Sequence, residues 1–302
     1  MNYNLGVSEV PQISLWDGVV MGGGVGVSIF GEFRVATERT MFAMPETAIG
    51  LFPDVGSSAW LPHLGNGLGE YIALTGTRLH AYDLCTIGLA THYLPSASLH
   101  SFEEGLVSNT GGGAGEIDGV STRAAVEGLL ATVGGGDVPD PSVSVFGADE
   151  ARGRARVAAC FFDKHSVEDI ITALEGLATV APSPEDGAWA EATLNQLNGA
   201  SPTSLKLTLA QIQRGRTLDL KGCLEMEFRL VQGCMRGGDF TEGVRAMLVD
   251  KDRSPRWVPS TLDAVDSTLV EAHFAPLVRE LVLEPCDTGL MGGGRRVVMA
   301  RL

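Results

Sequence analysis

Two short stretches near the N-terminus contain residue types that can carry chemistry, and the first is the glycine run at residues 22–26. Glycine lets a ligand approach backbone N–H groups closely, and a helix N-terminus adds unpaired donors. From the residues alone three uses stay open: a dinucleotide-binding loop, a backbone site that holds an oxyanion, and a close-packed turn. The pattern Gly-x-Gly-x-x-Gly fails in both registers, because Val27 and Ile29 occupy its last position, and this disfavours the dinucleotide loop.

The second stretch, residues 44–56, places Glu46 and Asp54 among apolar residues, glycines and prolines. A carboxylate in apolar surroundings is desolvated, which raises its pKa and suits acid–base work near neutral pH. Two such groups near one ligand titrate as a coupled pair. The alternative uses are helix capping, for which Asp54 before Val55-Gly56-Ser57 is well placed, and a solvated loop acid.

The elements that must position these residues alternate between short strands and helices. Apolar runs predict strands at 13–15, 19–21, 33–36 and 40–44, and helical patterning predicts helices at 25–30, 67–75 and 82–88. This alternation is typical of α/β organisation.

The rest of the chain divides into three further parts. After the core at residues 1–105, the prolines and two glycine triplets predict a loop or insertion region at 106–160. A mainly helical region at 161–275 is predicted to follow, in which Ser166 is the expected N-cap of a helix and Asp169 occupies the capping-box position. Residues 276–302 are expected to be a weakly packed tail.

Composition limits the classes of partner. Lys and Arg total 22 against 37 Asp and Glu, and this net charge of −15 disfavours nucleic acid and anionic lipid. No apolar run approaches the ~20 residues that a membrane span needs. Five widely spaced cysteines and six scattered histidines predict free thiols and no metal site.

Several ordered motifs together resemble the crotonase superfamily, and most closely its 3-hydroxyisobutyryl-CoA hydrolase branch. The main ones are residues 17–26 and 43–56, and the resemblance covers roughly residues 3–275. It continues through Leu74-Thr75-Gly76-Thr77-Arg78, Gly88-Leu89-Ala90-Thr91-His92, Ser201-Pro202-Thr203-Ser204-Leu205-Lys206 and the segments 235–246 and 250–257. The fold it implies is an α/β crotonase-like (ClpP/crotonase) fold with a mainly helical C-terminal region.

The resemblance implies a role for each site residue. Gly23 would donate a backbone N–H to the thioester carbonyl oxygen, as part of the oxyanion hole. Glu46 would be the catalytic carboxylate, either as nucleophile or as general base, and Asp54 would contact the 3-hydroxyl side of the substrate or assist the second step. Hydratases of this superfamily carry a second glutamate at the position that Gly26 occupies here. Because glycine has no side chain to transfer a proton, the resemblance favours hydrolysis over hydration.

The activity so implied is hydrolysis of 3-hydroxyisobutyryl-CoA in valine catabolism, with no metal or other cofactor and with CoA as part of the substrate. The alternatives are enoyl-CoA hydratase or isomerase activity, and an inactive acyl-CoA-binding homologue. The family has about a hundred further residues before the strand at Asp17-Gly18, including another oxyanion donor, so the chain is expected to be N-terminally truncated.

Three further expectations come from the same source. A homo-oligomer is possible, and the location would be mitochondrial in a eukaryote and cytoplasmic in a bacterium. The basic residues Arg236, Arg245, Lys251 and Arg256 could reach CoA phosphates, but the acids beside them make salt bridges the favoured interpretation.

Overall fold

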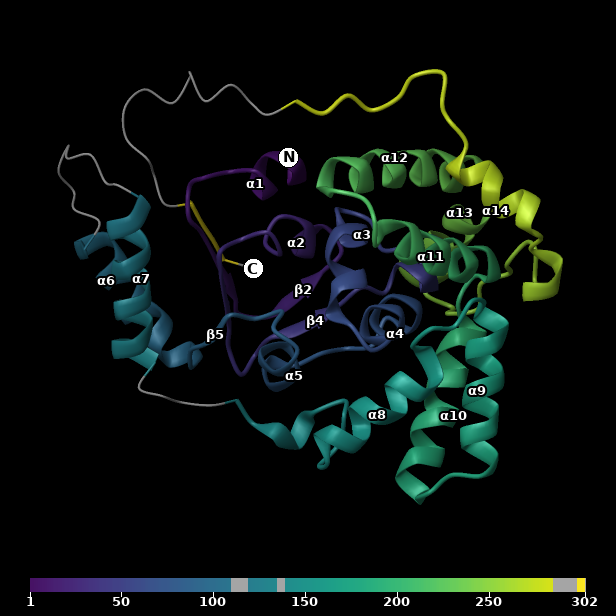
Figure 1. The fold of residues 1–302 in the computed structure, drawn as a ribbon, viewed down its shortest axis with the longest axis horizontal. Helices are drawn as coiled ribbons and strands as arrows, with labels where there is room; N and C mark the ends of the chain where they lie inside the picture. Colours follow the sequence, from purple (N-terminus) through teal and green to yellow (C-terminus); the bar gives the residue numbers. More distant parts are fainter. Residues whose placement is uncertain (110–118, 135–138, 285–297, 302) are drawn as a thin grey trace. The chain divides into compact units, whose positions relative to one another are not determined.

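The computed structural model describes residues 1–109, 119–134, 139–284 and 298–301 (Figure 1). The chain forms two compact units. Unit 1 comprises residues 1–42, 78–148 and 284–302, and unit 2 comprises residues 43–77 and 149–283. The division separates the two candidate stretches, because the glycine run lies in unit 1 while Glu46 and Asp54 lie in unit 2.

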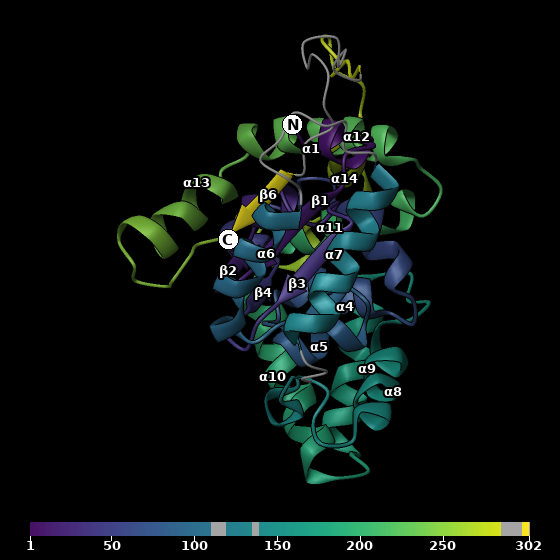
Figure 2. The same ribbon diagram turned by 90° about the vertical axis from the view of Figure 1, so that its left-hand side faces the viewer.

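Unit 1 is built on a parallel sheet. Among the described residues its strands follow the order β5-β3-β1-β6, and Figure 2 shows β3, β1 and β6 side by side. In the register of β1 and β3, Ile13 pairs with Phe33 and Leu15 with Val35. The bounds are β1 (Gln12–Trp16), β3 (Phe33–Ala36), β5 (His92–Tyr93) and β6 (Val298–Arg301), with β2 (Val19–Met21) and β4 (Met41–Ala43) forming a separate pair.

Two long helices supply the apolar partner of this sheet. Phe102 and Leu106 of α6 (Leu99–Asn109) and Val126 and Leu130 of α7 (Gly119–Gly134) form one buried cluster with the sheet residues Ile13, Leu15, Phe33 and Val35. Burying such side chains is the main favourable contribution to folding, about 1.5–3 kcal/mol each. The other helices of unit 1 are α1 (Asn2–Gly6), α2 (Gly23–Gly26) and α5 (Ala81–Thr86).

The sequence-based boundaries need three corrections. Residues 106–160 are not one loop or insertion region, because they contain α7 and nearly all of α8 (Glu150–Phe161). The four-residue spacing of Val126 and Leu130 gives α7 an apolar face. The predicted helix at 25–30 is replaced by the four-residue α2, since its glycines favour a turn. Residues 298–301 are not a loose tail, since they pair with β1. The triplets at 111–113 and 292–294, and residues 135–136 of the third, lie outside the described residues.

Unit 2 is helical in its described residues. Its core joins Phe52 to Leu207, Met226, Leu230 and Phe274, which come from three helices. Serine side chains cap several of these helices, and the predicted capping box of Ser166 and Asp169 is confirmed. The helices are α3 (Ser57–Trp60), α4 (Leu68–Thr75), α8 (Glu150–Phe161), α9 (Val167–Thr179), α10 (Pro184–Gly199), α11 (Pro202–Gly215), α12 (Leu220–Arg236), α13 (Asp239–Val244) and α14 (Ser267–Phe274).

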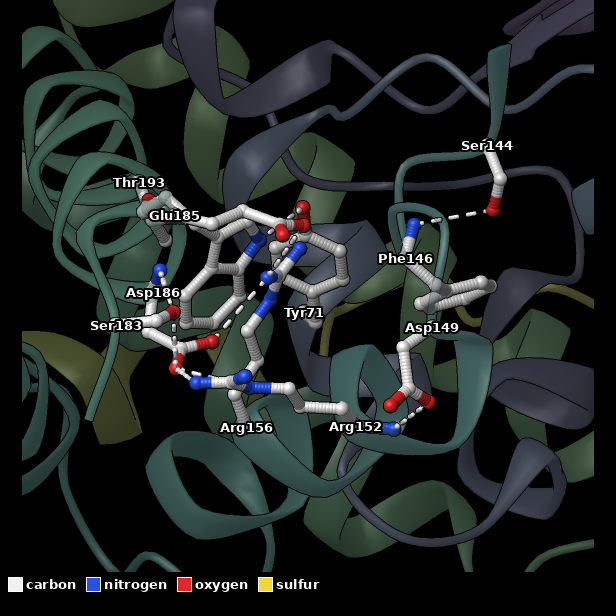
Figure 3. A network of polar contacts seen from close by, with 11 residues as sticks. Tyr71, Ser144, Phe146, Asp149, Arg152, Arg156, Ser183, Glu185, Asp186 and Thr193 are labelled. Carbon is white, nitrogen blue, oxygen red and sulfur yellow. Dashed lines mark hydrogen bonds and ion pairs between the residues drawn. The ribbon is translucent and has the colours of Figure 1, made fainter. Parts of the chain in front are cut away.

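A polar network ties α8 to α10 within unit 2 (Figure 3). The buried carboxylate of Asp186 accepts hydrogen bonds from Arg152 and Arg156 of α8 and from Ser183. The guanidinium of Arg156 also lies 5.1 Å from the centre of the Trp189 ring, a cation–π distance. The network therefore joins the two helices by hydrogen bonds, ion pairs and a cation–π contact.

Candidate active site

Glu46 occupies a position that suits acid–base or nucleophilic chemistry. It begins a short 3-10 helix, η1 (Glu46–Ile49), directly after β4 and Pro45, and only 5 % of its surface is exposed. Its Oε2 atom is buried and has no hydrogen-bond partner among the described residues. Burial, followed by the negative charge of Asp54, raises the pKa of Glu46 to about 8. An acid with this pKa changes protonation near physiological pH.

The turn that carries Glu46 is held on several sides within unit 2. Thr47 Oγ1 donates to the carbonyl oxygen of Leu74 at 3.2 Å, and its own carbonyl accepts from the N–H of Ser201 at 3.1 Å. η1 ends at Gly50, whose left-handed φ of +71° is readily adopted by glycine. Helix α13 packs against this turn. The backbone around Glu46 is therefore fixed by contacts remote in sequence.

Asp54 lies in the same unit, eight residues further on. Burial raises the pKa of Asp54 as well, and its charge is felt at Glu46. Both candidate carboxyl groups therefore lie in surroundings that raise their pKa values, and their joint action on one ligand stays a prediction. Asp54 does not cap a helix. The N-cap residue of α3 is Gly56, and no side chain within that segment caps α3.

Two buried polar residues that sequence reasoning missed hold the loop on either side of Asp54. Glu227 of α12 accepts hydrogen bonds from the N–H of Gly56 at 2.7 Å and from the N–H of Ser58 at 2.9 Å. Gln211 of α11 donates from Nε2 to the carbonyl oxygen of Pro53 at 2.5 Å. The available signal for Glu227 was an acid on the apolar stripe of an amphipathic helix, between Cys223 and Leu230.

Gly23 lies in unit 1, as the first residue of α2 and directly after Gly22, whose φ is +51°. It is exposed, and a Cβ added to it would meet nothing within 4 Å. The first N–H groups of a helix have no partner inside it, so this backbone is free in principle to face a ligand. The convergence of Gly23 with Glu46 on one carbonyl stays a prediction.

Among the four basic candidates near the C-terminus, Arg245 is held by neighbouring acids. Arg245 forms ion pairs with Glu242 at 2.8 Å and with Asp250 and Asp252 at 2.6 Å each, which confirms the salt-bridge interpretation for this residue. Within the described ranges, no three His, Cys, Asp or Glu side chains gather closely enough to hold a metal ion. No helix in the described part of the chain combines the length and apolar composition needed to cross a bilayer.

The family model described as enoyl-CoA hydratase/isomerase matches residues 1–274. The chain belongs to the enoyl-CoA hydratase/isomerase family. The resemblance to its 3-hydroxyisobutyryl-CoA hydrolases is confirmed by mitochondrial enzymes of that name from Gallus gallus and Homo sapiens. The Gallus gallus enzyme is 41 % identical over 90 % of this chain and 66 % of its own length. The Homo sapiens enzyme is 41 % identical over 92 % of this chain and 66 % of its own length. 3-Hydroxyisobutyryl-CoA hydrolase 1 of Arabidopsis thaliana is 40 % identical over 93 % of the chain and 70 % of the relative.

Solved structures agree on the fold of this family. A carnitinyl-CoA dehydratase from Mycobacterium thermoresistibile matches with a TM-score of 0.76 and 33 % identity, over 93 % of this chain and 72 % of that one. An enoyl-CoA hydratase from Rhodobacter sphaeroides matches with a TM-score of 0.71 and 28 % identity, over 91 % and 71 %. The α/β crotonase fold is therefore confirmed. The chain spans about two thirds of the length of the curated relatives it matches.

Proposed function

We propose that the chain hydrolyses the thioester of 3-hydroxyisobutyryl-CoA to 3-hydroxyisobutyrate and CoA, a step of valine catabolism. The observation that carries the proposal is the buried carboxyl of Glu46, with one oxygen unpartnered among the described residues and a pKa near 8. Burying a carboxyl oxygen without a hydrogen-bond partner costs stability, and a catalytic role would explain why this cost is tolerated. The relatives named for this hydrolase support the choice of substrate.

Two routes use the same groups. In the first, ionised Glu46 attacks the thioester carbonyl carbon, the C–S bond breaks, CoA leaves as the thiolate, and water then hydrolyses the mixed anhydride. In the second, Glu46 takes a proton from the water that attacks. In both, the N–H of Gly23 would donate to the carbonyl oxygen as negative charge develops there, and Asp54 would contact the 3-hydroxyl side of the substrate. The nucleophilic route is our proposal, by analogy with the family.

The experiment follows thiol release from 3-hydroxyisobutyryl-CoA by the purified chain and its Glu46→Gln variant. Loss of a catalytic carboxyl is expected to lower kcat by at least about 10²-fold. Glu191→Gln, an exposed acid on α10, is the matched control and is expected to retain full activity. Thiol release that survives in Glu46→Gln at the wild-type rate would refute the assignment.

Enoyl-CoA hydratase or isomerase activity is the second candidate, because the solved relatives are named as a hydratase and a dehydratase. Gly26 argues against hydration, since it is buried and has no side chain to move a proton. Absorbance of the conjugated double bond, followed with crotonyl-CoA, separates the two. Water addition without thiol release would favour the hydratase.

The proposed function also implies a binding partner and a cellular location. Acyl-CoA is the partner, and no metal or further cofactor is proposed for the reaction. The mitochondrial relatives support a mitochondrial location if the chain is eukaryotic, and the cytoplasm is proposed for a bacterial source. Self-association is also proposed, and light scattering of the eluting protein measures it.

A further inference from the structure

The carboxylate of Glu227 is almost completely buried, with 3 % of the residue exposed, and it contacts one short segment. One oxygen accepts from the N–H of Gly56 at 2.7 Å, and the other accepts from both the N–H of Ser58 at 2.9 Å and its hydroxyl at 2.6 Å. These donors lie about 170 residues earlier in the chain and follow directly after Asp54. A buried acid thus makes three hydrogen bonds to the segment that carries the second candidate carboxyl.

The segment needs this support because its backbone is strained. Val55 has a φ of +55° and Gly56 a φ of +88°, so two successive residues are left-handed. For a β-branched residue such as valine this conformation costs on the order of 1–2 kcal/mol, and it persists only where the surroundings determine it. Gly56 is also the N-cap of α3 and has no side chain to satisfy the first N–H groups of that helix. The carboxylate of Glu227 takes the place of a cap.

A second buried side chain fixes the other end of the same segment. Gln211 donates to the carbonyl oxygen of Pro53 and, at 3.0 Å, to Ser57 Oγ, which itself donates to that carbonyl. The backbone is therefore fixed on both sides of Asp54, by Gln211 of α11 before it and by Glu227 of α12 after it. Burial raises the pKa of Glu227 to about 7, and the negative charge of Asp54 adds to this effect. The three hydrogen bonds act in the opposite direction and lower it.

We propose that Glu227 is a positioning residue for thioester hydrolysis: its carboxylate fixes the turn 55–58 and so aims Asp54 relative to Glu46 and the substrate. The inference rests on the proposed function and deepens it. Glu227 does not touch the substrate. It acts through Asp54, and a displacement of about 1 Å in a group that orients a substrate can cost up to 10²-fold in rate.

The test compares Glu227→Gln, Glu227→Asp and a control on the same helix, Glu225→Gln, whose side chain is 30 % exposed and pairs with Lys221. Glutamine keeps the size of the side chain but turns an NH₂ group toward an N–H donor, so the turn must shift. We expect kcat to fall by about 10- to 10²-fold with KM changed less than about threefold. Glu227→Asp restores the charge and both acceptors, so it should recover part of the loss, and Glu225→Gln should equal the wild type.

A readout independent of activity keeps the two proposals apart. The carboxyl ¹³C signal of Asp54, identified with Asp54→Asn, reports its titration, which we expect to move in Glu227→Gln and to stay in Glu225→Gln. If the wild-type chain releases no thiol while the Asp54 titration moves, the proposed function fails and the control of Asp54 by Glu227 stands. If folded Glu227→Gln loses only stability, with kcat and the Asp54 titration unchanged, Glu227 is a packing residue and the inference is overturned. Should Glu227→Gln not fold, Glu227→Asp is read by the same criteria.

Discussion

Gly50 lies directly against the backbone of Asp239, so that a Cβ on Gly50 would fall 2.3 Å from the Asp239 carbonyl oxygen. The contact is reciprocal, because a Cβ on Gly243 would lie 2.3 Å from the carbonyl of Ile49. Asp239 cannot move away easily, since its carboxylate accepts hydrogen bonds from Ser201 Oγ at 2.6 Å and from the N–H of Val258 at 2.8 Å. Two glycines therefore let α13 close onto the turn that begins at Glu46.

Replacing Gly50 by alanine should destabilise the fold strongly. Alanine adds both the strain of a left-handed φ and a collision with a fixed backbone, together on the order of 3 kcal/mol. Gly88→Ala is the control, because Gly88 also has a positive φ, of +76°, but nothing lies within 4 Å of an added Cβ, so only about 1 kcal/mol is expected. Urea unfolding of both variants measures the difference. Equal losses would show that α13 does not press on the turn.

Glu46→Gln should stabilise the protein more at high pH than at low pH. The unfolded carboxyl titrates near its ordinary value of 4.5 and the folded one near 8, so between these values the folded state binds more protons. Stability therefore falls as pH rises through this window, by roughly 3–5 kcal/mol in total, and is constant above it. Glutamine removes the titrating group and this slope. Unfolding free energies at pH 5 and pH 9 for the variant, the wild type and Glu191→Gln test it. A wild-type difference no larger than that of Glu46→Gln would contradict the burial of the carboxyl.

The candidate acids were predictable because their signal is local. Glu46 and Asp54 stand among apolar residues within a dozen positions, and desolvation follows from that composition alone. The capping box of Ser166 and Asp169 is local in the same sense. Family resemblance then added roles that the residue types themselves leave open.

The support of the site was not predictable because it is long-range. Glu227 looks like one more residue of an amphipathic helix until α12 is packed against the loop at Gly56. The pairing of β6 with β1 joins residues almost 300 positions apart, and no pattern within residues 298–301 specifies a partner strand. Helix α7 was obscured by its flanking glycines, although its apolar spacing was present.

Neutralising Asp186 should loosen the junction of α8 and α10 without touching the proposed chemistry. Its side chain is 4 % exposed, and it balances Arg156, which is 7 % exposed (Figure 3). Replacing Asp186 leaves the buried Arg156 with the exposed Glu185 as its remaining ion-pair partner shown here, and weakening the compensation of a buried charge is unfavourable. Asp186→Asn should therefore lower the urea midpoint clearly. Glu185→Gln, in an ion pair with the same arginine but with a side chain 58 % exposed, should have little effect. An Asp186→Asn midpoint equal to that of the wild type would mean that the buried pair adds nothing to stability. The KM for the thioester should be unchanged in both variants.

The pH dependence of hydrolysis should report the coupling between the two candidate acids. Only ionised Glu46 can attack a carbonyl or take a proton from water, so kcat/KM should rise with pH and level off above about 8. Asp54→Asn removes a neighbouring negative charge that raises the pKa of Glu46, and the rising limb should move to lower pH. It should stay above 4.5, because burial is the larger cause of the shift. The position of the limb is the readout, since its height falls for any damaged site. A limb that does not move in Asp54→Asn would mean that the two carboxyl groups titrate independently, and Asp54 would then act on the substrate alone.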